Sequence, residues 1–470
     1  MMMHLRITLL GLFLVTSVAL QARGFTTIRG TIGNANGYQI RLHTWVDQVT
    51  YTEKRLAMAT IDDRGNFNLI TELDEVTQAF FYIGNIRADI ILEPGTAYEI
   101  RFDDYPPISY RETRNLFLQR ETIGYTLVNR PEDDLNHIAG ELIGIYNRFL
   151  ANHYMDLYYR RHQVVDDFTD SLFLMFGHHT HPWIRHMVDY RIASLKLAGY
   201  KVSLDQAHSL WFRDADFEYN HPDFMDLFNQ LFNNYLTTRL RHYSYNELMS
   251  VINERGSYFA LSELIGRDTV LRNELLREIV MIKGLGEIMH HRDFSQSGVI
   301  RILRHIATSS KFREHRTIAN NLIYSNRRFS KGVMAPDFSL PDQNGTLHSL
   351  RQFRGKHLYL IFFTSNCIPC LSELRLLSAA YPQLKDHLNV LAIGLDPSPE
   401  KLFGVSEQQQ YPWPVVHFNN DFELTYRFNI RNYPFFILIA PDGSYEVYDA
   451  RRPSNRFQLW FEEVILNKRN

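Results

Sequence analysis

The pattern of apolar and polar positions changes along the chain, and its first part predicts strands. From Phe25 to about Asp104, short alternating stretches are separated by turn signals such as Asp62-Asp-Arg-Gly65 and Glu93-Pro-Gly95. Alternation with a period of two is typical of strands that bury one face. We therefore expect a β-sandwich-like domain over residues 25–105, with strands at Gln39 to Trp45, Asn66 to Leu73, Ala79 to Ile83 and Ala97 to Phe102.

The second pattern predicts helices. Between residues 110 and 328, apolar positions recur at helical spacing, as in Leu142, Ile145, Tyr146 and Phe149. This period places apolar side chains on one face of a helix. We expect a central, all-α helical region over 110–328, with breaks at Gly177, Pro182, Pro222, Gly256 and Gly298.

The third pattern combines a buried strand, a turn and a helix. Leu358 to Phe363 form a continuous apolar run, which is typical of a strand buried on both faces. Leu371, Leu374 and Leu377 then follow at helical spacing. Cys367 and Cys370 are the only cysteines of the chain, and both fall at the junction of strand and helix.

A cysteine at the start of a helix is a candidate nucleophile. The unpaired N–H groups and the positive end of the helix dipole both stabilise a thiolate there, which points to Cys367. Cys370 lies one turn further on, where it can attack a mixed disulfide on Cys367 and release the substrate as a thiol. A structural zinc site would need two more ligands, and the 470 residues contain no further cysteine. The pair is therefore interpreted as a redox pair.

The motifs around the pair resemble those of a known family. Ala335-Pro-Asp-Phe-Ser-Leu340, the Asn344-Gly345 turn and Asn432-Tyr-Pro434 occur in the order found in the thioredoxin-fold domain of TlpA/ResA-like thiol-disulfide oxidoreductases. The resemblance implies an α/β thioredoxin fold over 331–470, and hence a multidomain α+β protein. It also implies that Pro434 is cis and faces the cysteines, and that Glu373 is the acidic residue of a C-x-x-C-x-x-E motif. The expected catalytic set is Cys367, Cys370, Glu373 and Pro434.

Three positions depart from this family. Asn366 replaces the usual tryptophan before the first cysteine, and Tyr433 precedes the proline where threonine or valine is commoner. Ile361 stands where thioredoxin has a buried aspartate. We therefore expect Glu373 or water to handle the proton of the resolving thiol.

The N-terminus predicts export. Residues 1–22 carry His4 and Arg6 before an apolar run from Ile7 to Leu20, followed by small residues, which is the pattern of a secretory signal peptide. The run is shorter than the roughly 20 residues that span a bilayer, so no stable membrane insertion is expected. No cysteine follows it, which argues against a lipid anchor. For the resembled family, this implies a periplasmic protein.

The net charge and the histidines do not indicate a further binding site. The formal net charge is −2, so we expect no nucleic-acid partner. His178, His179, His181 and His186 cluster near Pro182, but an exposed loop between helices explains them better than a metal site does. We expect neither a metal nor a cofactor.

Three functions remain as hypotheses. The first is a thiol-disulfide oxidoreductase of the envelope that reduces protein disulfides with electrons from a membrane thiol donor, as the family implies. The second is a peroxiredoxin, which is favoured by Thr364 three residues before Cys367 but not by Leu360, where that family has proline. The third is a binding protein with a residual thioredoxin domain. Retention of Cys367, Cys370, Glu373 and Pro434 favours the first.

Overall fold

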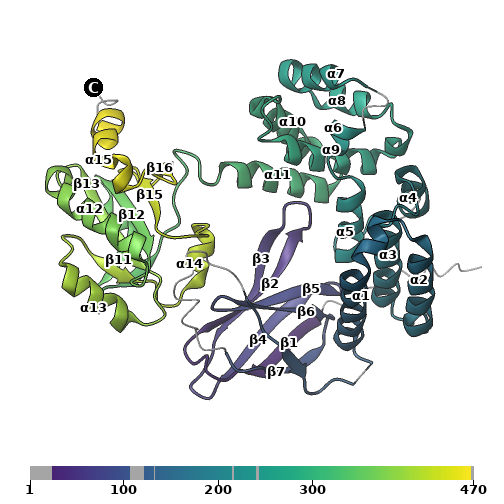
Figure 1. Cartoon of the computed structure of the whole chain (residues 1–470), viewed down its shortest axis with the longest axis horizontal. Coiled ribbons are helices and arrows are strands. Elements are labelled where there is room, and N and C mark those ends of the chain that lie inside the picture. The colour runs from purple at the N-terminus through teal and green to yellow at the C-terminus, as the bar shows by residue number, and fades with distance from the viewer. Residues whose placement is uncertain (1–23, 106–120, 132, 214–215, 240–242, 467–470) are drawn as a thin grey trace, which may run out of the picture.

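The computed structural model describes residues 24–105, 121–131, 133–213, 216–239 and 243–466. Figure 1 shows strands, then helices, then a mixed α/β region in chain order. The expected signal peptide at 1–22 lies outside the described residues. Within the described ranges, no helix is both long enough and apolar enough to cross a membrane.

The first region consists of two sheets. One has the order β4-β1-β7-β9 and the other β3-β2-β5-β6-β8. The strands are β1 (Gly24–Thr31), β2 (Gln39–Asp47), β3 (Thr52–Thr60), β4 (Asn66–Leu73), β5 (Thr77–Ile83), β6 (Ile86–Leu92), β7 (Ala97–Phe102), β8 (Glu121–Thr122) and β9 (Tyr125–Leu127).

Both sheets contribute to one apolar core. Every second residue of β4 and β7 is buried, so the alternation in the sequence corresponds to the inner and outer faces of the sheet. Ile28 and Leu69 of one sheet and Leu42 and Phe81 of the other belong to the same cluster. The four expected strands are present as β2, β4, β5 and β7.

The helices begin later than the sequence pattern suggests. Residues 121–127, which were expected to be helical, instead form β8, parallel to β6, and β9, antiparallel to β7. These strands are too short to show a period of their own, and their pairing with distant strands fixes them. The first helix starts at Leu135, where Asp134 accepts a hydrogen bond from the N–H of Asn136.

The helical region follows from Leu135 to Arg327. Its elements are α1 (Leu135–Tyr158), α2 (His162–Phe176), α3 (Pro182–Ala198), α4 (Leu204–Trp211), α5 (Pro222–Leu231), α6 (Tyr235–Thr238), α7 (Tyr245–Ser250), η2 (Val251–Arg255), α8 (Tyr258–Ile265), η3 (Thr269–Leu271), α9 (Glu274–Ile288), α10 (Gln296–Ser309) and α11 (Arg313–Arg327). Pro182 and Pro222 start helices and Gly177 and Gly256 end them, as expected, whereas Gly298 lies within the first turn of α10 and breaks no helix.

Two cores hold these helices. The α1, α2 and α3 helices share one cluster, which also includes Ile91 of β6. The later helices pack around a second, larger cluster. Asn136 of α1 bonds both the N–H and the carbonyl of Ile91, which fixes the first helix against the edge of the β region.

The last region is built on a five-stranded sheet of order β14-β13-β12-β15-β16. The β12, β13 and β14 strands are parallel, and β15 and β16 are antiparallel to their neighbours. The elements are β10 (Ser339–Pro341), β11 (Leu347–Ser349), η4 (Leu350–Phe353), β12 (His357–Phe363), α12 (Ile368–Leu384), β13 (Leu388–Gly394), α13 (Pro399–Gln409), β14 (Val415–His417), α14 (Phe422–Arg427), β15 (Phe435–Ile439), β16 (Tyr445–Tyr448), η5 (Pro453–Asn455), α15 (Phe457–Trp460) and η6 (Phe461–Leu466).

This region has a core of its own. All seven residues of β12 are buried, as its continuous apolar run predicts. On one face of β12, Tyr359 stacks on Phe457 of α15 with the ring centroids 4.1 Å apart. The strand therefore lies at the centre of the sheet, with α15 packed against one of its faces.

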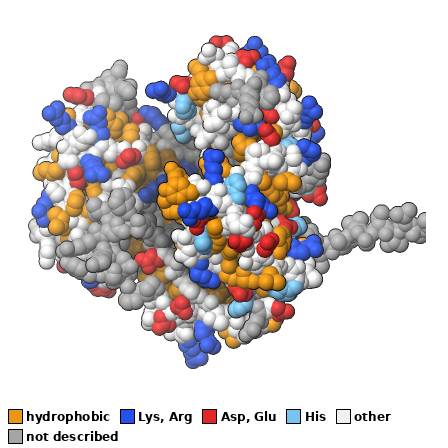
Figure 2. All heavy atoms as spheres, turned by 45° about the vertical axis from the view of Figure 1, so that its right-hand side comes forward, with side chains coloured by type: hydrophobic (Ala, Val, Ile, Leu, Met, Phe, Trp, Pro, Cys, Tyr) orange, Lys and Arg blue, Asp and Glu red, His pale blue; other side chains and the backbone are white. Residues whose placement is uncertain are grey.

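The α/β region also contacts the β region through α14, which lies beside that sheet in Figure 1. Arg41 of β2 is 2% exposed and directs Nη1 toward Oε2 of Glu423, 3.3 Å away. The Tyr82 and Tyr426 rings lie 5.6 Å apart across the same contact. The face drawn in Figure 2 carries basic and acidic side chains intermixed with patches of apolar ones.

Candidate active site

Cys367 and Cys370 form a disulfide at the start of α12. Cys367 is the N-cap residue of the helix, and its sulfur accepts a hydrogen bond from the N–H of Cys370, 3.1 Å away. Pro369 stands in the first turn, where a missing N–H costs little. A donor that points at Cys367 Sγ would also stabilise negative charge on that sulfur, as the sequence analysis expects of the attacking thiol.

Both cysteines are sheltered in the oxidised state. Cys367 is 4% exposed and Cys370 is fully buried, whereas Ile368 between them is 79% exposed. The difference in access between the two sulfurs has the expected order but is small. Ile368 offers an exposed apolar contact for an incoming chain right beside the attacking cysteine.

The strand register brings Pro434 to the same end of the sheet. The Tyr433–Pro434 peptide bond is cis, as the family resemblance implies. Phe435 pairs with Phe362 across β15 and β12, so Pro434 lies next to the end of the strand that leads to Cys367. Burial raises the pKa of Tyr433 to about 12, so its hydroxyl stays neutral.

Glu373 is buried and bound, which the sequence analysis did not anticipate. Its carboxylate accepts hydrogen bonds from the N–H and the hydroxyl of Ser454, at 2.9 and 2.6 Å. Glu373 is 8% exposed, so it is not a solvated surface residue. The carboxylate therefore ties α12 to the segment that leads into α15.

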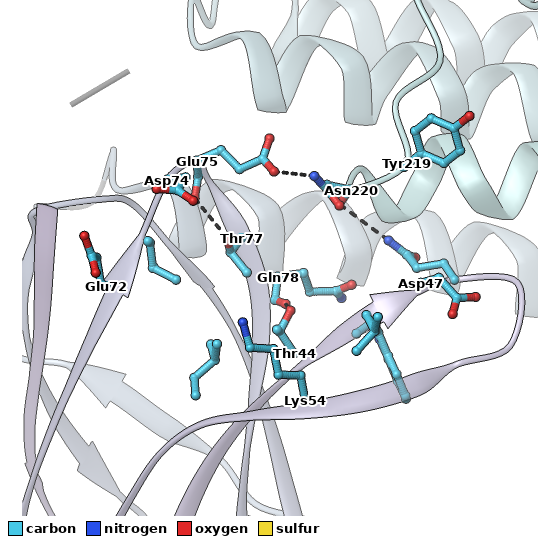
Figure 3. Close-up of a pocket in the computed structure, with 15 residues that line it drawn as sticks. Thr44, Asp47, Lys54, Glu72, Asp74, Glu75, Thr77, Gln78, Tyr219 and Asn220 are labelled. Atoms are coloured by element: carbon cyan, nitrogen blue, oxygen red, sulfur yellow. Dashed lines mark hydrogen bonds between the residues drawn. The ribbon is translucent and has the colours of Figure 1, made fainter. Parts of the chain in front are cut away.

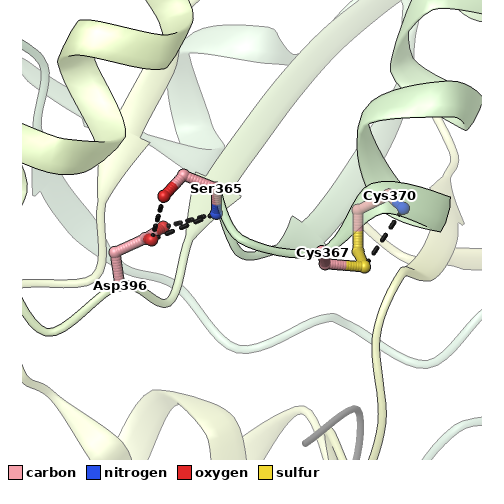
Figure 4. The surroundings of a disulfide bond; sticks show 4 residues. All are labelled: Ser365, Cys367, Cys370 and Asp396. Carbon is pink, nitrogen blue, oxygen red and sulfur yellow. Dashed lines mark hydrogen bonds between the residues drawn. A yellow bond between two sulfur atoms is a disulfide. The ribbon is translucent and has the colours of Figure 1, made fainter. Parts of the chain in front are cut away.

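A second buried carboxylate near the pair is not among the predicted site residues. Asp396, at the end of β13, is 1% exposed and accepts three contacts from Ser365, which is two residues before Cys367. Figure 4 shows these contacts beside the disulfide. The available signal was a polar residue directly after the apolar run of a strand parallel to β12, since such residues meet at one edge of the sheet.

Three further positions lie near the pair in the sequence or in the strand that leads to it. Asn366 is exposed and Ile361 is fully buried. The Thr364 hydroxyl is buried and has no hydrogen-bond partner among the described residues. In this turn, the Thr364 hydroxyl therefore has no partner among the described residues, whereas the hydroxyl of the next residue, Ser365, donates to Asp396.

The histidines of the helical region have ordinary partners. His181 caps α3 by accepting from the N–H of Trp183, and His186 lies 3.0 Å from Oε1 of Glu218. Within the described ranges, no three His, Cys, Asp or Glu side chains are grouped so that they could hold a metal ion.

A cavity of about 270 Å³ lies far along the chain from the cysteines, between the β region and the helical region. Figure 3 shows Asn220 reaching across it to Glu75, whose carboxylate it bonds. Burial raises the pKa of Glu75. The lining residues come from the β region and from Tyr219 and Asn220, so this cavity is separate from the redox site.

Comparisons with known proteins concern the α/β region. A model of the AhpC/TSA family matches residues 332–445. The thiol-disulfide oxidoreductase ResA of Geobacillus kaustophilus is 28% identical over 128 residues, which cover 27% of this chain and 73% of that protein. ResA of Bacillus subtilis is 27% identical over 128 residues, which cover 27% of this chain and 71% of that protein.

A solved structure also matches part of the chain. The thioredoxin domain of a thiol-disulfide oxidoreductase from Bacteroides vulgatus is 24% identical with a TM-score of 0.27, and covers 29% of this chain and 98% of that chain. The family match and the ResA relatives agree with the disulfide at the start of α12. The C-terminal part of the chain is an AhpC/TSA-type thioredoxin-like domain with ResA thiol-disulfide oxidoreductases among its homologues, and Cys367 and Cys370 give it the paired cysteines of such an oxidoreductase.

Proposed function

We propose that the chain is a periplasmic thiol-disulfide oxidoreductase that reduces disulfides in proteins of the cell envelope. The observation that carries the proposal is the Cys367–Cys370 disulfide at the N-terminus of α12, at the same end of the sheet as cis-Pro434. The export pattern in residues 1–22 supports the compartment. In an oxidising compartment, a single pair of cysteines at this position favours redox chemistry over metal binding.

The proposed reaction proceeds in two exchanges. The Cys367 thiolate attacks one sulfur of a substrate disulfide, forms a mixed disulfide and expels the other substrate sulfur as a thiolate. Cys370 then loses its proton to Glu373 or water and attacks Cys367 Sγ, which releases the second substrate thiolate. Two electrons pass to the substrate, whose thiolates take protons from solvent. The enzyme is left with the Cys367–Cys370 disulfide.

A new cycle needs a reductant for that disulfide. We assign this role to a membrane thiol donor, which would run the same exchange in reverse at Cys367. The cis-Pro434 segment and the exposed Ile368 border the attacking sulfur and supply the contact for an extended chain. We further propose three domains after the signal peptide, at 25–105 together with 121–127, at 135–328 and at 331–470, with the first two serving docking or spacing.

The test is an insulin-reduction assay with the full chain, together with the equilibrium of the pair against glutathione. We expect turnover that depends on both cysteines. The Cys367→Ser variant should be inactive, and an active variant would overturn the proposal. A chain that binds envelope proteins but reduces no disulfide would instead support the binding-protein hypothesis.

A peroxidase is the second candidate. The AhpC/TSA match at 332–445 and the unpartnered, buried hydroxyl of Thr364 favour it. Leu360 stands where a peroxiredoxin has proline, which weighs against it. A peroxide-consumption assay on the reduced protein separates the two, because a disulfide reductase without peroxidase activity consumes peroxide no faster than a simple dithiol does.

A further inference from the structure

Hydrogen bonds fix the turn that carries Cys367. The N–H of Cys367 donates to the carbonyl of Thr364, 3.2 Å away, so residues 364–367 form a tight turn between β12 and α12. Ser365 is the second residue of this turn. Its N–H lies 3.1 and 3.0 Å from the two Asp396 oxygens, and its hydroxyl donates to Oδ1 at 2.5 Å. The N–H and the hydroxyl of Ser365 therefore both donate to the Asp396 carboxylate.

Asp396 is enclosed by groups that leave its charge unbalanced. The adjacent His417 of β14 donates Nε2–H to the Asp396 carbonyl, 2.6 Å away, and accepts from the N–H of Asn419 at Nδ1. These two bonds fit a neutral ring, and burial also lowers the His417 pKa. Tyr433, from the cis-proline segment, also faces Asp396 and stays neutral, while Glu400 of α13 faces His417.

Two effects of opposite sign act on the pKa of the Asp396 carboxylate. Burial raises the pKa of Asp396, and the hydrogen bonds from Ser365 act in the opposite direction because they stabilise the charged form. Within the described ranges, no Lys or Arg forms an ion pair with Asp396, and His417 lowers the Asp396 pKa through its charge only when its ring is protonated. An ionised Asp396 therefore places a buried negative charge under the turn that presents Cys367.

We propose that Asp396 is a positioning residue of the redox site, which acts through Ser365 to hold the 364–367 turn and sets the thiolate fraction of Cys367. This proposal rests on the proposed function and adds a determinant of its reactivity. The charge of Asp396 opposes a second negative charge on Cys367, while the anchored turn keeps Cys367 at the N-cap, where the Cys370 N–H stabilises it. The negative charge of Asp396 thereby makes the reduced Cys367–Cys370 pair less stable. The chain is a stronger reductant with this charge than it would be without it.

The test uses Asp396→Asn in the full chain, because asparagine keeps the shape and still accepts from the Ser365 N–H while it removes the charge. In a Cys370→Ser background, Cys367 is the only thiol, so the pH profile of its alkylation reports its pKa directly. We expect this pKa to fall by ~0.5 unit or more, which is about a threefold change in thiolate fraction. With both cysteines present, the equilibrium with glutathione should move toward the dithiol.

Asp442→Asn is the matched control. Asp442 also accepts from the N–H and the hydroxyl of one serine, Ser444, at 2.9 and 2.7 Å, but in the turn after β15, at the end of that strand away from Cys367. This variant should leave the Cys367 pKa and the glutathione equilibrium unchanged. If Asp396→Asn does not fold, Ser365→Ala takes its place. It removes one donor, raises the Asp396 pKa and should shift the Cys367 pKa in the same direction by less.

The outcomes separate the inference from the proposed function. A folded Asp396→Asn or Ser365→Ala variant whose Cys367 pKa equals or exceeds the unmodified value overturns the positioning role. An equal shift in Asp442→Asn also overturns it, because the effect would then not be specific to the turn. A chain that does not exchange with glutathione at all contradicts the proposed function, whereas the alkylation profile still decides the role of Asp396.

Discussion

At the residue scale, the two cysteines are set apart more by hydrogen bonding than by access. Cys367 is 4% exposed against 0% for Cys370, and Cys367 Sγ alone receives a backbone N–H. We expect Cys370→Ser to trap substrate proteins as mixed disulfides on Cys367, and Cys367→Ser to trap few. Non-reducing gels of envelope extracts measure this. Equal trapping by both variants would mean that the attacking and resolving roles are wrongly assigned.

Glu373 lends itself to a paired experiment. Its carboxylate is bound by Ser454, so Glu373→Gln should lower the free energy of unfolding by about 1 to 2 kcal/mol as a charged hydrogen bond is lost. We also expect it to change the thiol titration and slow turnover, because Glu373 is the candidate acceptor for the Cys370 proton.

Ser454→Ala provides the control for Glu373. It removes the hydroxyl donor but leaves the carboxylate as a proton acceptor, so it should lower stability while turnover continues, whereas Glu373→Gln should slow turnover. If Glu373→Gln behaves in the same way, Glu373 acts on stability alone and has no part in proton transfer. Chemical denaturation and pH-rate profiles, measured on both variants, distinguish the two results.

The residues that sequence could identify are those with a local motif. Cys367, Cys370 and Glu373 follow one another at three-residue intervals, and Pro434 has a recognisable neighbourhood, so the sequence was sufficient to find them. Asp396 lies more than one element away from the cysteines and acquires its role only when β13 pairs with β12. The binding of Glu373 to Ser454 was likewise not predictable, since it depends on how the last segment packs.

At the element scale, turns fix which strands pair. Gly65, between β3 and β4, has φ +81°, and a Cβ there would lie 2.4 Å from the carbonyl oxygen of Ile32. Gly37 has φ +78° but open space around the Cβ position. We expect Gly65→Ala to destabilise the protein by several kcal/mol, and Gly37→Ala by only ~1 kcal/mol from its backbone conformation. Thermal unfolding measures both, and equal losses would show that the contact with Ile32 carries no weight.

The elements also show where periodicity is a sufficient guide. The expected strands Asn66 to Leu73 and Ala97 to Phe102 agree with β4 and β7 to the residue, because each is long enough to show its buried face. The β8 and β9 strands have two and three residues, too few for any period. Their partners in the sheets, not their own sequence, determine them.

At the scale of the whole molecule, the α/β region is joined to the rest by few and mostly polar contacts. Arg55 Nη1 lies 2.7 Å from Glu423 Oε2 and adds to the Arg41 contact on the same carboxylate. Glu423 is about one-third exposed, so screening by solvent limits what these pairs contribute to stability. In contrast, the apolar core of the α/β region is formed by residues 335–465 alone.

We therefore expect a fragment from Lys331 to Asn470 to fold by itself and to keep the redox activity, since neither its core nor its cysteine turn needs the β or helical regions. Phe329, just before the fragment, stacks on Tyr448 with the ring centroids 4.1 Å apart. A fragment that begins at Arg328 should consequently melt at a higher temperature than the one that begins at Lys331. Circular dichroism and insulin reduction measure both fragments. Two folded but inactive fragments would show that the β or helical region completes the site, and that substrates meet Cys367 only in the full chain.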